Sequence, residues 1–275
     1  MQADPPLDRQ IVLHKALNKI FPAISWPENE TALPAMHAVM DDTKSVPLNK
    51  ANAQENAMTQ RIAFIHTVGF LIEEFRARMR AELPTADCFH ILNESLLQDL
   101  LRGVPQPQVY QRVVDQIVLA AQAQPDLIVV TCSSTSLAVD IARSIVSQPI
   151  LKIDDPMASE AVRRGARIGL LCTATSTVEP SSALLHAHAA VQGRDITIKT
   201  VLCPEAYQAL MAGDRARHDA ILHEAARGIS NEVDVLVLAQ ASLAHLRDGL
   251  AAELECPVLA SPSLLMGEIA RRCAE

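Results

Sequence analysis

An internal repeat is the feature of this sequence that most limits how the chain can fold. Three segments occur twice, in the same order and at nearly the same spacing. They are Arg61–Thr67 with Arg167–Thr173 (offset 106), Asp126–Ser134 with Asp234–Ser242 (offset 108), and Pro149–Leu151 with Pro257–Leu259 (offset 108). Each contains a short apolar run of the kind that forms a buried strand. The repeat therefore predicts two similar units of structure.

Between the repeated segments, apolar runs alternate with stretches of helical spacing. In the first half we expect strands at 61–65, 88–92, 127–130 and 149–153, and helices at about 70–82, 109–122 and 137–147. In the second half, Thr197–Leu202 takes the place of the second strand. Such alternation favours parallel sheets that are covered on both faces. The predicted fold class is α/β, with two pseudo-symmetric lobes that each consist of a parallel sheet flanked by helices.

The chain also divides by composition. Residues 1–57 carry several prolines and a polar stretch, so we expect an N-terminal extension that is partly flexible. The first lobe is predicted at 58–156 and the second lobe at 157–256. Residues 257–275 are expected to pack back on the first lobe. Met58 then begins a stretch that would be complete as a domain on its own.

Charge and composition exclude several kinds of partner. The net charge is −8 and aromatic residues make up 3% of the chain, which disfavours nucleic-acid binding. The sequence has no apolar run of about 18 residues, so no membrane span is expected. The six cysteines form no Cys-x-x-Cys pair, and we predict no metal site. We expect a cytoplasmic protein with reduced thiols that forms a homo-oligomer, by default a dimer.

Cys132 stands at the most distinctive point of the repeat. It follows the apolar run Leu127–Val130 and precedes the hydroxyl residues Ser133–Ser136, after which helical spacing begins. This pattern predicts a buried strand, a tight turn and a helix, with Cys132 at the strand end where α/β sheets bind their ligands. Backbone N–H groups at a helix start favour a thiolate, so we expect a reactive thiol.

Three motifs at predicted strand ends resemble those of the aspartate/glutamate racemase superfamily. They are Val130–Ser134, Ile168–Thr173 with Thr177, and Leu236–Ser242. The resemblance covers about residues 59–270 and implies a small carboxylate substrate and no cofactor. In this superfamily a thiolate removes the proton on the carbon alpha to a carboxylate, and a thiol on the other lobe delivers one to the opposite face. The resemblance thus implies that Cys132 is an acid/base catalyst.

One position departs from this pattern. Gln240 stands where relatives with two cysteines carry the second one. An amide cannot act as an acid or a base near neutral pH. Three interpretations remain: Cys132 works alone, Cys172 or His66 is the second acid/base, or the protein binds its ligand without turnover. His66 and Cys172 both stand at strand ends, although a structural role suits either of them.

Hydroxyl and amide groups near the same strand ends are candidates for binding the substrate carboxylate. We predict such contacts for Thr67, Glu94, Ser133, Ser134, Thr173, Thr177, Gln240, Ala241 and Ser242. Glu94 is alternatively a favourable charge at a helix start, and Thr177 is alternatively a helix cap. Asp154 is interpreted as part of a turn and cap before a helix, and His218 with Asp219 as a surface pair.

Together these features favour a racemase, epimerase or isomerase that acts at the carbon alpha to the carboxylate of a small acid or amino acid. The alternatives are a decarboxylase that uses Cys132 alone and a non-catalytic protein that binds small carboxylates. Gln240 in place of a second cysteine raises the standing of both alternatives.

Overall fold

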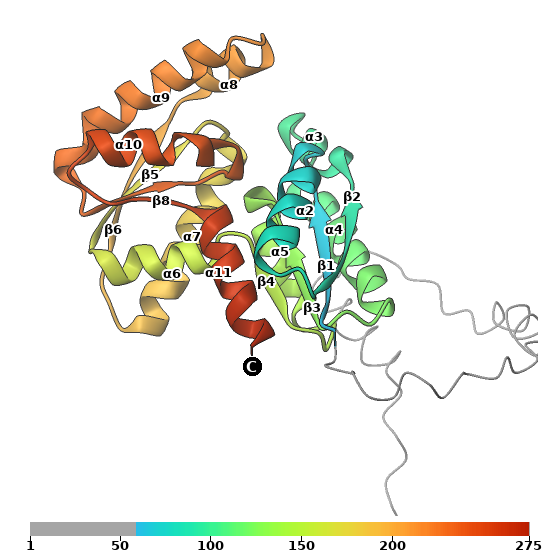
Figure 1. Ribbon diagram of the computed structural model, residues 1–275. Helices are drawn as coiled ribbons and strands as arrows, with labels where there is room; N and C mark the ends of the chain where they lie inside the picture. Colours follow the sequence, from blue (N-terminus) through green and yellow to red (C-terminus); the bar gives the residue numbers. More distant parts are fainter. Residues whose placement is uncertain (1–58, 275) are drawn as a thin grey trace, which may run out of the picture. The chain divides into compact units, whose positions relative to one another are not determined.

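The structure is a computed structural model and describes residues 59–274. It contains two four-stranded sheets, in the orders β2-β1-β3-β4 and β6-β5-β7-β8, and all of their pairings are parallel. The strands are β1 (Arg61–His66), β2 (Asp87–Leu92), β3 (Leu127–Val130), β4 (Ile150–Lys152), β5 (Arg167–Cys172), β6 (Thr197–Leu202), β7 (Val235–Leu238) and β8 (Val258–Ala260). The predicted α/β fold with two lobes is confirmed (Figure 1). The predicted extension at 1–57 lies outside the described residues.

The two sheets have the same strand order and the same register. Ile62 of β1 is paired with Leu127 of β3, and Ile168 of β5 is paired with Val235 of β7. These two pairs are related by the offsets of the sequence repeat. The strand β6 lies beside β5 as β2 lies beside β1, so the predicted second-strand position is also confirmed.

The repeat extends to side-chain contacts at the start of the central strands. The Asp126 carboxylate accepts a hydrogen bond from the Arg61 backbone N–H at 2.7 Å. In the second lobe the Asp234 carboxylate accepts one from the Arg167 N–H at 2.8 Å. A single bond of this kind contributes about 1 kcal/mol to stability. Its more important effect is to fix where each pair of neighbouring strands begins.

Helices cover both faces of the first sheet. They are α2 (Phe70–Glu82), α3 (Glu94–Leu101), α4 (Gln106–Gln122) and α5 (Ser136–Ala142). Ala63 and Ile65 pack against α4 and α5, whereas Ile62 and Phe64 pack against α2 on the opposite face. This division follows from the strand itself, because successive side chains of a strand point to opposite faces.

The second sheet is covered in the same way. Its helices are α6 (Asp155–Arg164), α7 (Thr175–Gln192), α8 (Pro204–Met211), α9 (Arg215–Ile229) and α10 (Arg247–Glu253). Ile168 and Leu170 pack against α6 and α7, and Leu171 packs on the opposite face against α9 and α10. Sheets buried on both faces need the near-continuous apolar strands that the repeat supplies.

The C-terminal segment is divided between the lobes, which corrects the expectation that all of 257–275 packs on the first lobe. The strand β8 is paired with β7 in the second sheet. The last helix, α11 (Ser261–Cys273), packs with α2 against the first sheet and lies between the two sheets in Figure 1. Its Leu265, Met266 and Ile269 are fully buried, and each such side chain contributes roughly 1.5–3 kcal/mol.

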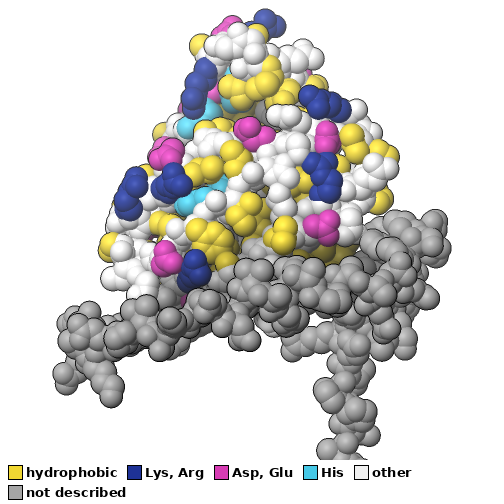
Figure 2. All heavy atoms as spheres, turned by 90° about the vertical axis from the view of Figure 1, so that its right-hand side faces the viewer, with side chains coloured by type: hydrophobic (Ala, Val, Ile, Leu, Met, Phe, Trp, Pro, Cys, Tyr) yellow, Lys and Arg dark blue, Asp and Glu magenta, His cyan; other side chains and the backbone are white. Residues whose placement is uncertain are grey.

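The surface carries a mixture of charges. On the face shown in Figure 2, basic and acidic side chains lie among each other instead of forming a patch of one sign. Pairs along single helices contribute to such mixing, for example Glu74 with Arg78 at 3.0 Å. Among the helices of residues 59–274, none has both the length and the hydropathy that crossing a membrane requires.

Candidate active site

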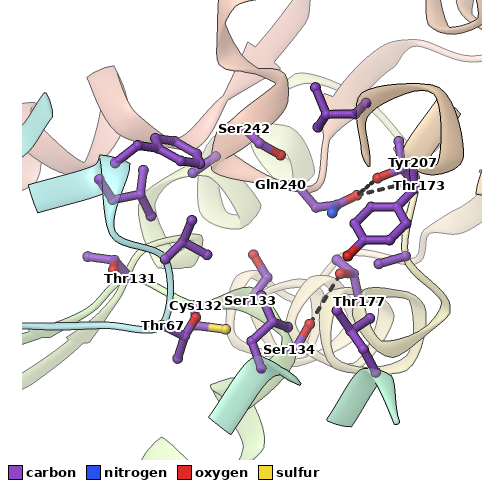
Figure 3. A pocket seen from close by; sticks show the side chains of 18 of the residues that line it. Thr67, Thr131, Cys132, Ser133, Ser134, Thr173, Thr177, Tyr207, Gln240 and Ser242 are labelled. Atoms are coloured by element: carbon purple, nitrogen blue, oxygen red, sulfur yellow. Dashed lines mark hydrogen bonds between the residues drawn. The ribbon is translucent and has the colours of Figure 1, made fainter. Parts of the chain in front are cut away.

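A cavity lies between the two lobes, where the carboxyl ends of the central strands meet. Thr67 follows β1 and Cys132 follows β3, while Thr173 follows β5 and Gln240 follows β7. All four residues line the cavity, which has a volume of about 200 Å³ (Figure 3). The strand order places these residues together, because parallel strands end at the same edge of a sheet.

Cys132 lies at the bottom of this cavity and is 7% exposed. It has an extended backbone and is followed by a single turn of 3-10 helix, Ser133–Thr135. Burial raises the pKa of the thiol, and donors from Thr67 and from the Ser134 backbone N–H oppose this effect only in part. The donors that we expected are therefore present, but the thiol is favoured over the expected thiolate. Loss of water around the sulfur outweighs the N–H groups.

The Thr67 hydroxyl is available to donate a hydrogen bond to the Cys132 sulfur. Its Oγ1 is buried and has no hydrogen-bond partner of normal geometry within residues 59–274. The hydroxyl of Thr135, in contrast, donates to the carbonyl oxygen of Cys132 at 3.1 Å. A buried hydroxyl without a partner costs free energy, which a thiolate or a ligand oxygen would recover.

Gln240 occupies the position in the second lobe that Cys132 occupies in the first. Both residues are extended and both precede a 3-10 helix, which for Gln240 is η5 (Ala241–Leu246). The Gln240 Oε1 atom accepts hydrogen bonds from the Thr173 backbone N–H at 2.6 Å and from its hydroxyl at 3.1 Å. The amide oxygen is thus satisfied, and the amide N–H₂ group is left as a donor for a ligand.

Hydroxyl groups connect the two lobes beside the cavity. Ser134 Oγ lies 3.0 Å from Ser176 Oγ and 3.4 Å from Thr177 Oγ1. Ser134 belongs to the first lobe, whereas Ser176 and Thr177 belong to the first turn of α7. Ser133, Ala241 and Ser242 also line the cavity, so most of the predicted binding residues lie together.

Tyr207 lines the cavity as well, and the sequence analysis did not identify it. It lies in α8, the helix that follows β6. Figure 3 shows its ring among the side chains of the cavity, on the side of Thr173 and Gln240. The signal in the sequence is weak: Tyr207 is one of only two tyrosines, and it follows a strand that ends at the same edge of the sheet.

The remaining lining is apolar, and among the described residues it includes no charged side chain and no histidine. Three of its apolar residues are unusually exposed: Phe70 is 55% exposed, Leu101 is 43% exposed and Met211 is 63% exposed. The apolar lining residues are Val68, Phe70, Leu71, Leu97, Leu101, Ala174, Leu210, Met211 and Ala241. An uncharged cavity with an exposed apolar rim suits a small ligand with an apolar part.

His66 lies outside the set of cavity-lining residues. It shares the face of β1 that carries Phe64, and it is stacked on that ring at 5.9 Å. Its Nδ1 lies 2.8 Å from Thr131 Oγ1 and its Nε2 lies 2.8 Å from His90 Nδ1. Burial, and then the charges of His90 and Arg76, lower the pKa of His66 to about 3. The side chain is a neutral hydrogen-bonded group that supports Thr131, which does line the cavity.

Cys172 and Glu94 also lie outside the lining. Cys172 is fully buried among apolar side chains of the second lobe, and burial together with the nearby Cys203 raises its pKa to about 12. Glu94 is the first residue of α3 and is exposed. Cys172 lies on the same face of β5 as Ile168 and Leu170, so the alternation of the strand directs its side chain into the core beneath α6 and α7.

Asp154 is a buried acid next to the Cys132 loop. It precedes α6 but does not cap it through its side chain, which corrects the expected capping role. Burial raises its pKa to about 6, and the hydroxyls of Ser133 and Ser261 oppose that rise. Neither of its carboxylate oxygens has a hydrogen-bond partner of normal geometry within residues 59–274. The ionised form is therefore poorly stabilised in the folded protein.

Replacing Asp154 by asparagine should stabilise the protein at pH 8. The carboxyl of Asp154 has a pKa of about 6 in the folded protein and 3.8 in the unfolded chain, so the folded protein binds this proton more tightly. The free energy of unfolding therefore falls as the pH rises from about 4 to about 6. The shift corresponds to about 3 kcal/mol. Urea unfolding of Asp154→Asn should thus show a gain of up to about 3 kcal/mol at pH 8 and little change at pH 4.

Asp155 provides the matched control. Although it is partly buried, hydrogen bonds from His188, the Lys152 N–H and Arg143 hold its pKa below its ordinary value. Its carboxylate lies 2.8 Å from Arg143. Asp155→Asn should therefore destabilise the protein at pH 8. Equal effects of the two substitutions, or destabilisation by Asp154→Asn at pH 8, would contradict this account of Asp154.

The fold and the cavity define a class of protein: two similar α/β lobes with a thiol at their facing strand ends. The chain belongs to the Asp/Glu/hydantoin racemase family, whose model matches residues 70–269. The resemblance inferred from the sequence is thereby confirmed. A glutamate racemase of Synechocystis sp. is 30% identical over 151 residues, and the match covers 52% of this chain and 52% of that protein. The chain thus aligns with about half the length of this curated relative.

Solved structures of racemases have the same fold. A glutamate racemase isoform from Bacillus anthracis is 18% identical, with a TM-score of 0.61, over 79% of this chain and 82% of that chain. The Picrophilus torridus aspartate racemase is 14% identical, with a TM-score of 0.60, over 78% and 94%. Allantoin racemase from Klebsiella pneumoniae is 18% identical, with a TM-score of 0.59, over 78% and 88%. At these identities the likeness establishes the fold and not the substrate.

Proposed function

We propose that the protein is a cofactor-independent racemase or epimerase that moves a proton at the carbon alpha to a carboxylate. One observation carries the proposal. Cys132 and Tyr207 are the only titratable side chains that line the cavity among the described residues, and they belong to different lobes. Thiols and phenols both serve as general acids and bases. A substrate held between them would lose its alpha proton to one residue, and the planar carbanion that forms would receive a proton from the other.

Cys132 is assigned the base on one face of the substrate. The Thr67 hydroxyl and the Ser134 N–H are donors that would stabilise its thiolate, whereas burial of the sulfur stabilises the thiol. A buried thiolate is poorly solvated, so its proton affinity is high. The raised pKa thus makes Cys132 a better match for a weakly acidic carbon than an exposed cysteine would be.

Donors on both sides of the cavity would stabilise the enediolate that forms when the proton leaves. Ser133 lies beside Cys132, and Ser242 with the Gln240 amide lies across the cavity. Hydrogen bonds to a developing negative charge are strongest where water is excluded. In this assignment Gln240 binds the carboxylate or its enediolate and takes no part in proton transfer.

The substrate is proposed to be a monocarboxylic acid with an apolar substituent. The lining has no carboxylate to pair with an ammonium group and no Lys or Arg to pair with a second carboxylate, among the described residues. Burying either charge without a partner is costly. The apolar side chains of Phe70, Leu101 and Met211 at the rim would instead be covered by the apolar substituent of the acid.

Exchange of the alpha proton in deuterated water tests this substrate class. The protein should catalyse deuterium uptake into mandelate or lactate with a kcat/KM at least about tenfold above that for aspartate or glutamate, because only the latter bring an ammonium group and a second carboxylate that the lining leaves unpaired. Proton NMR of each acid gives the rates directly. Faster exchange of glutamate than of mandelate would overturn the substrate class. Release of carbon dioxide from a substituted malonate, without exchange of any monocarboxylate, would point to the alternative in which Cys132 works alone.

A further inference from the structure

A second group of chemically active side chains lies outside the cavity of Cys132. His218 and Asp219 belong to α9, and His245 belongs to η5. Their ligand atoms lie within 4.8 Å of one another. We propose that these three residues form a binding site for a divalent transition-metal ion, with Zn²⁺ as the best match. The site is independent of the reaction proposed for Cys132.

The two imidazoles converge on a single oxygen atom. His218 Nδ1 lies 2.6 Å from Asp219 Oδ1, and His245 Nε2 lies 2.9 Å from the same atom. The rings are stacked, with centroids 6.0 Å apart. Two imidazole nitrogens and a carboxylate oxygen are the ligands that Zn²⁺ prefers after thiolates, and three protein ligands are typical of a zinc ion that keeps one open position.

One ring nitrogen of His218 is buried without a partner. It is 1% exposed, so the surface pair expected from the sequence is wrong for this residue. Its Nε2 has no hydrogen-bond partner within residues 59–274. With the proton on Nδ1, the ring donates to the Asp219 carboxylate at 2.6 Å and Nε2 is left as a buried acceptor; with the proton on Nε2, the lone pair of Nδ1 faces that carboxylate. A cation bound to Nδ1 and Oδ1 would favour the second tautomer, because it takes the place of the proton between these two atoms.

His245 is already held as a metal ligand usually is. Its Nδ1 lies 2.9 Å from the backbone carbonyl oxygen of Ser242, which can only accept a hydrogen bond. The neutral tautomer with the proton on Nδ1 satisfies this contact and leaves the Nε2 lone pair for a metal. Histidine ligands commonly donate their second N–H to a carbonyl in this way, which fixes the direction of the ring.

The surroundings leave access to the three side chains. His218 and His245 line a hollow of about 820 Å³ that would admit an ion and a water ligand. Three arginines line it: Arg78 is paired with Glu74 at 3.0 Å and Arg247 with Asp248 at 2.6 Å, whereas Arg215 has no ion pair within residues 59–274. Two of the three positive charges are thus neutralised locally. The same hollow includes Ser242, so the site adjoins the cavity of Cys132.

The spacing of the three residues explains why this site could not be predicted from the sequence. His218 and Asp219 are neighbours in the sequence. His245 follows Asp219 by 26 residues, and the strand β7 lies between them in the chain. Zinc patterns that can be read from a sequence have short spacings within one turn or hairpin. Only the fold brings η5 beside α9.

Metal titration of the chelator-treated, full-length protein tests the proposal. Zn²⁺ followed by calorimetry should bind with one ion per chain, and Co²⁺ should produce the visible absorption bands of a tetrahedral site. His245→Ala and Asp219→Asn should each weaken Zn²⁺ binding at least about 100-fold, since even changes in groups behind the ligands cost 10–100-fold. Circular dichroism should show that both variants are folded, because the two side chains are partly exposed.

Two control variants make the result decisive. His223→Ala removes another histidine of α9, one whose ring lies 3.2 Å from Glu253 and outside the three-residue group. Cys132→Ser removes the thiol that could bind Zn²⁺ in the cavity. Both should bind Zn²⁺ as the wild type does. The proposal is overturned if the wild type binds neither ion, if His245→Ala and Asp219→Asn bind as tightly as the wild type, or if either control loses the ion.

Discussion

Replacing Cys132 by serine should lower the rate of alpha-proton exchange by about 10²- to 10⁴-fold, the contribution typical of a general base. The hydroxyl of serine keeps the size of the side chain but is far too weak an acid to supply the conjugate base. Proton NMR in deuterated water measures the loss with any acid that the wild type exchanges. Ligand binding should persist, because the donors from Ser133, Gln240 and Ser242 remain.

The pH dependence identifies the group that is lost. Burial raises the pKa of Cys132 above its ordinary value of 9.0, so the fraction of reactive thiolate in the wild type should still be increasing at pH 9. This rising limb should be absent from Cys132→Ser. Cys88→Ser is the matched control, because Cys88 lies in β2 outside the cavity. An unchanged pH profile in Cys132→Ser, or an equal loss in Cys88→Ser, would show that Cys132 is not the base.

Replacing Tyr207 by phenylalanine should separate exchange from inversion. The ring keeps its packing and only the hydroxyl is removed, so the face served by Cys132 is left intact. We expect the interconversion of enantiomers to fall about 10²- to 10⁴-fold. Deuterium, which early in the wild-type reaction enters only the newly formed enantiomer, should now enter the starting enantiomer through Cys132. Chiral chromatography measures the first rate, and proton NMR measures the second.

A second substitution sharpens the test of Tyr207. Gln240→Cys in the Tyr207→Phe protein places a thiol at the position that mirrors Cys132, and it should restore part of the inversion. Recovery should be incomplete, because Gln240 also holds Thr173 through contacts of 2.6 and 3.1 Å. If Tyr207→Phe lowers exchange and inversion equally, Tyr207 acts in binding and not as the second acid/base.

The fold and half of the cavity follow from local features of the sequence. The repeat produces two sheets with the same strand order, because the repeated apolar segments form the same strand pairings in each lobe. Cys132, Thr173 and Gln240 stand within two residues of a strand end, so the edge of the sheet brings them together. A residue that stands just after a strand is held near the edge of the sheet. Its position could therefore be predicted from the sequence.

Features that depend on how elements pack could not be predicted in this way. Tyr207 reaches the cavity from within α8, and His245 reaches His218 from another element. The pKa of Cys132 depends on a balance between N–H donors and burial, and only the structure shows that burial prevails. The case of His66 is different. The alternation of β1 already places it on the face of Phe64, so a stricter use of strand periodicity would have removed it from the cavity.

The central claim is that two groups, on opposite faces of one carbon, move the alpha proton. One pure enantiomer of an exchanging acid, incubated with the wild-type protein in deuterated water, tests it most directly. Early in the reaction the newly formed enantiomer should carry deuterium, while the unreacted enantiomer keeps its proton, because each face exchanges through its own residue. Deuterium that enters both enantiomers equally from the start would mean that a single group serves both faces and would contradict the account.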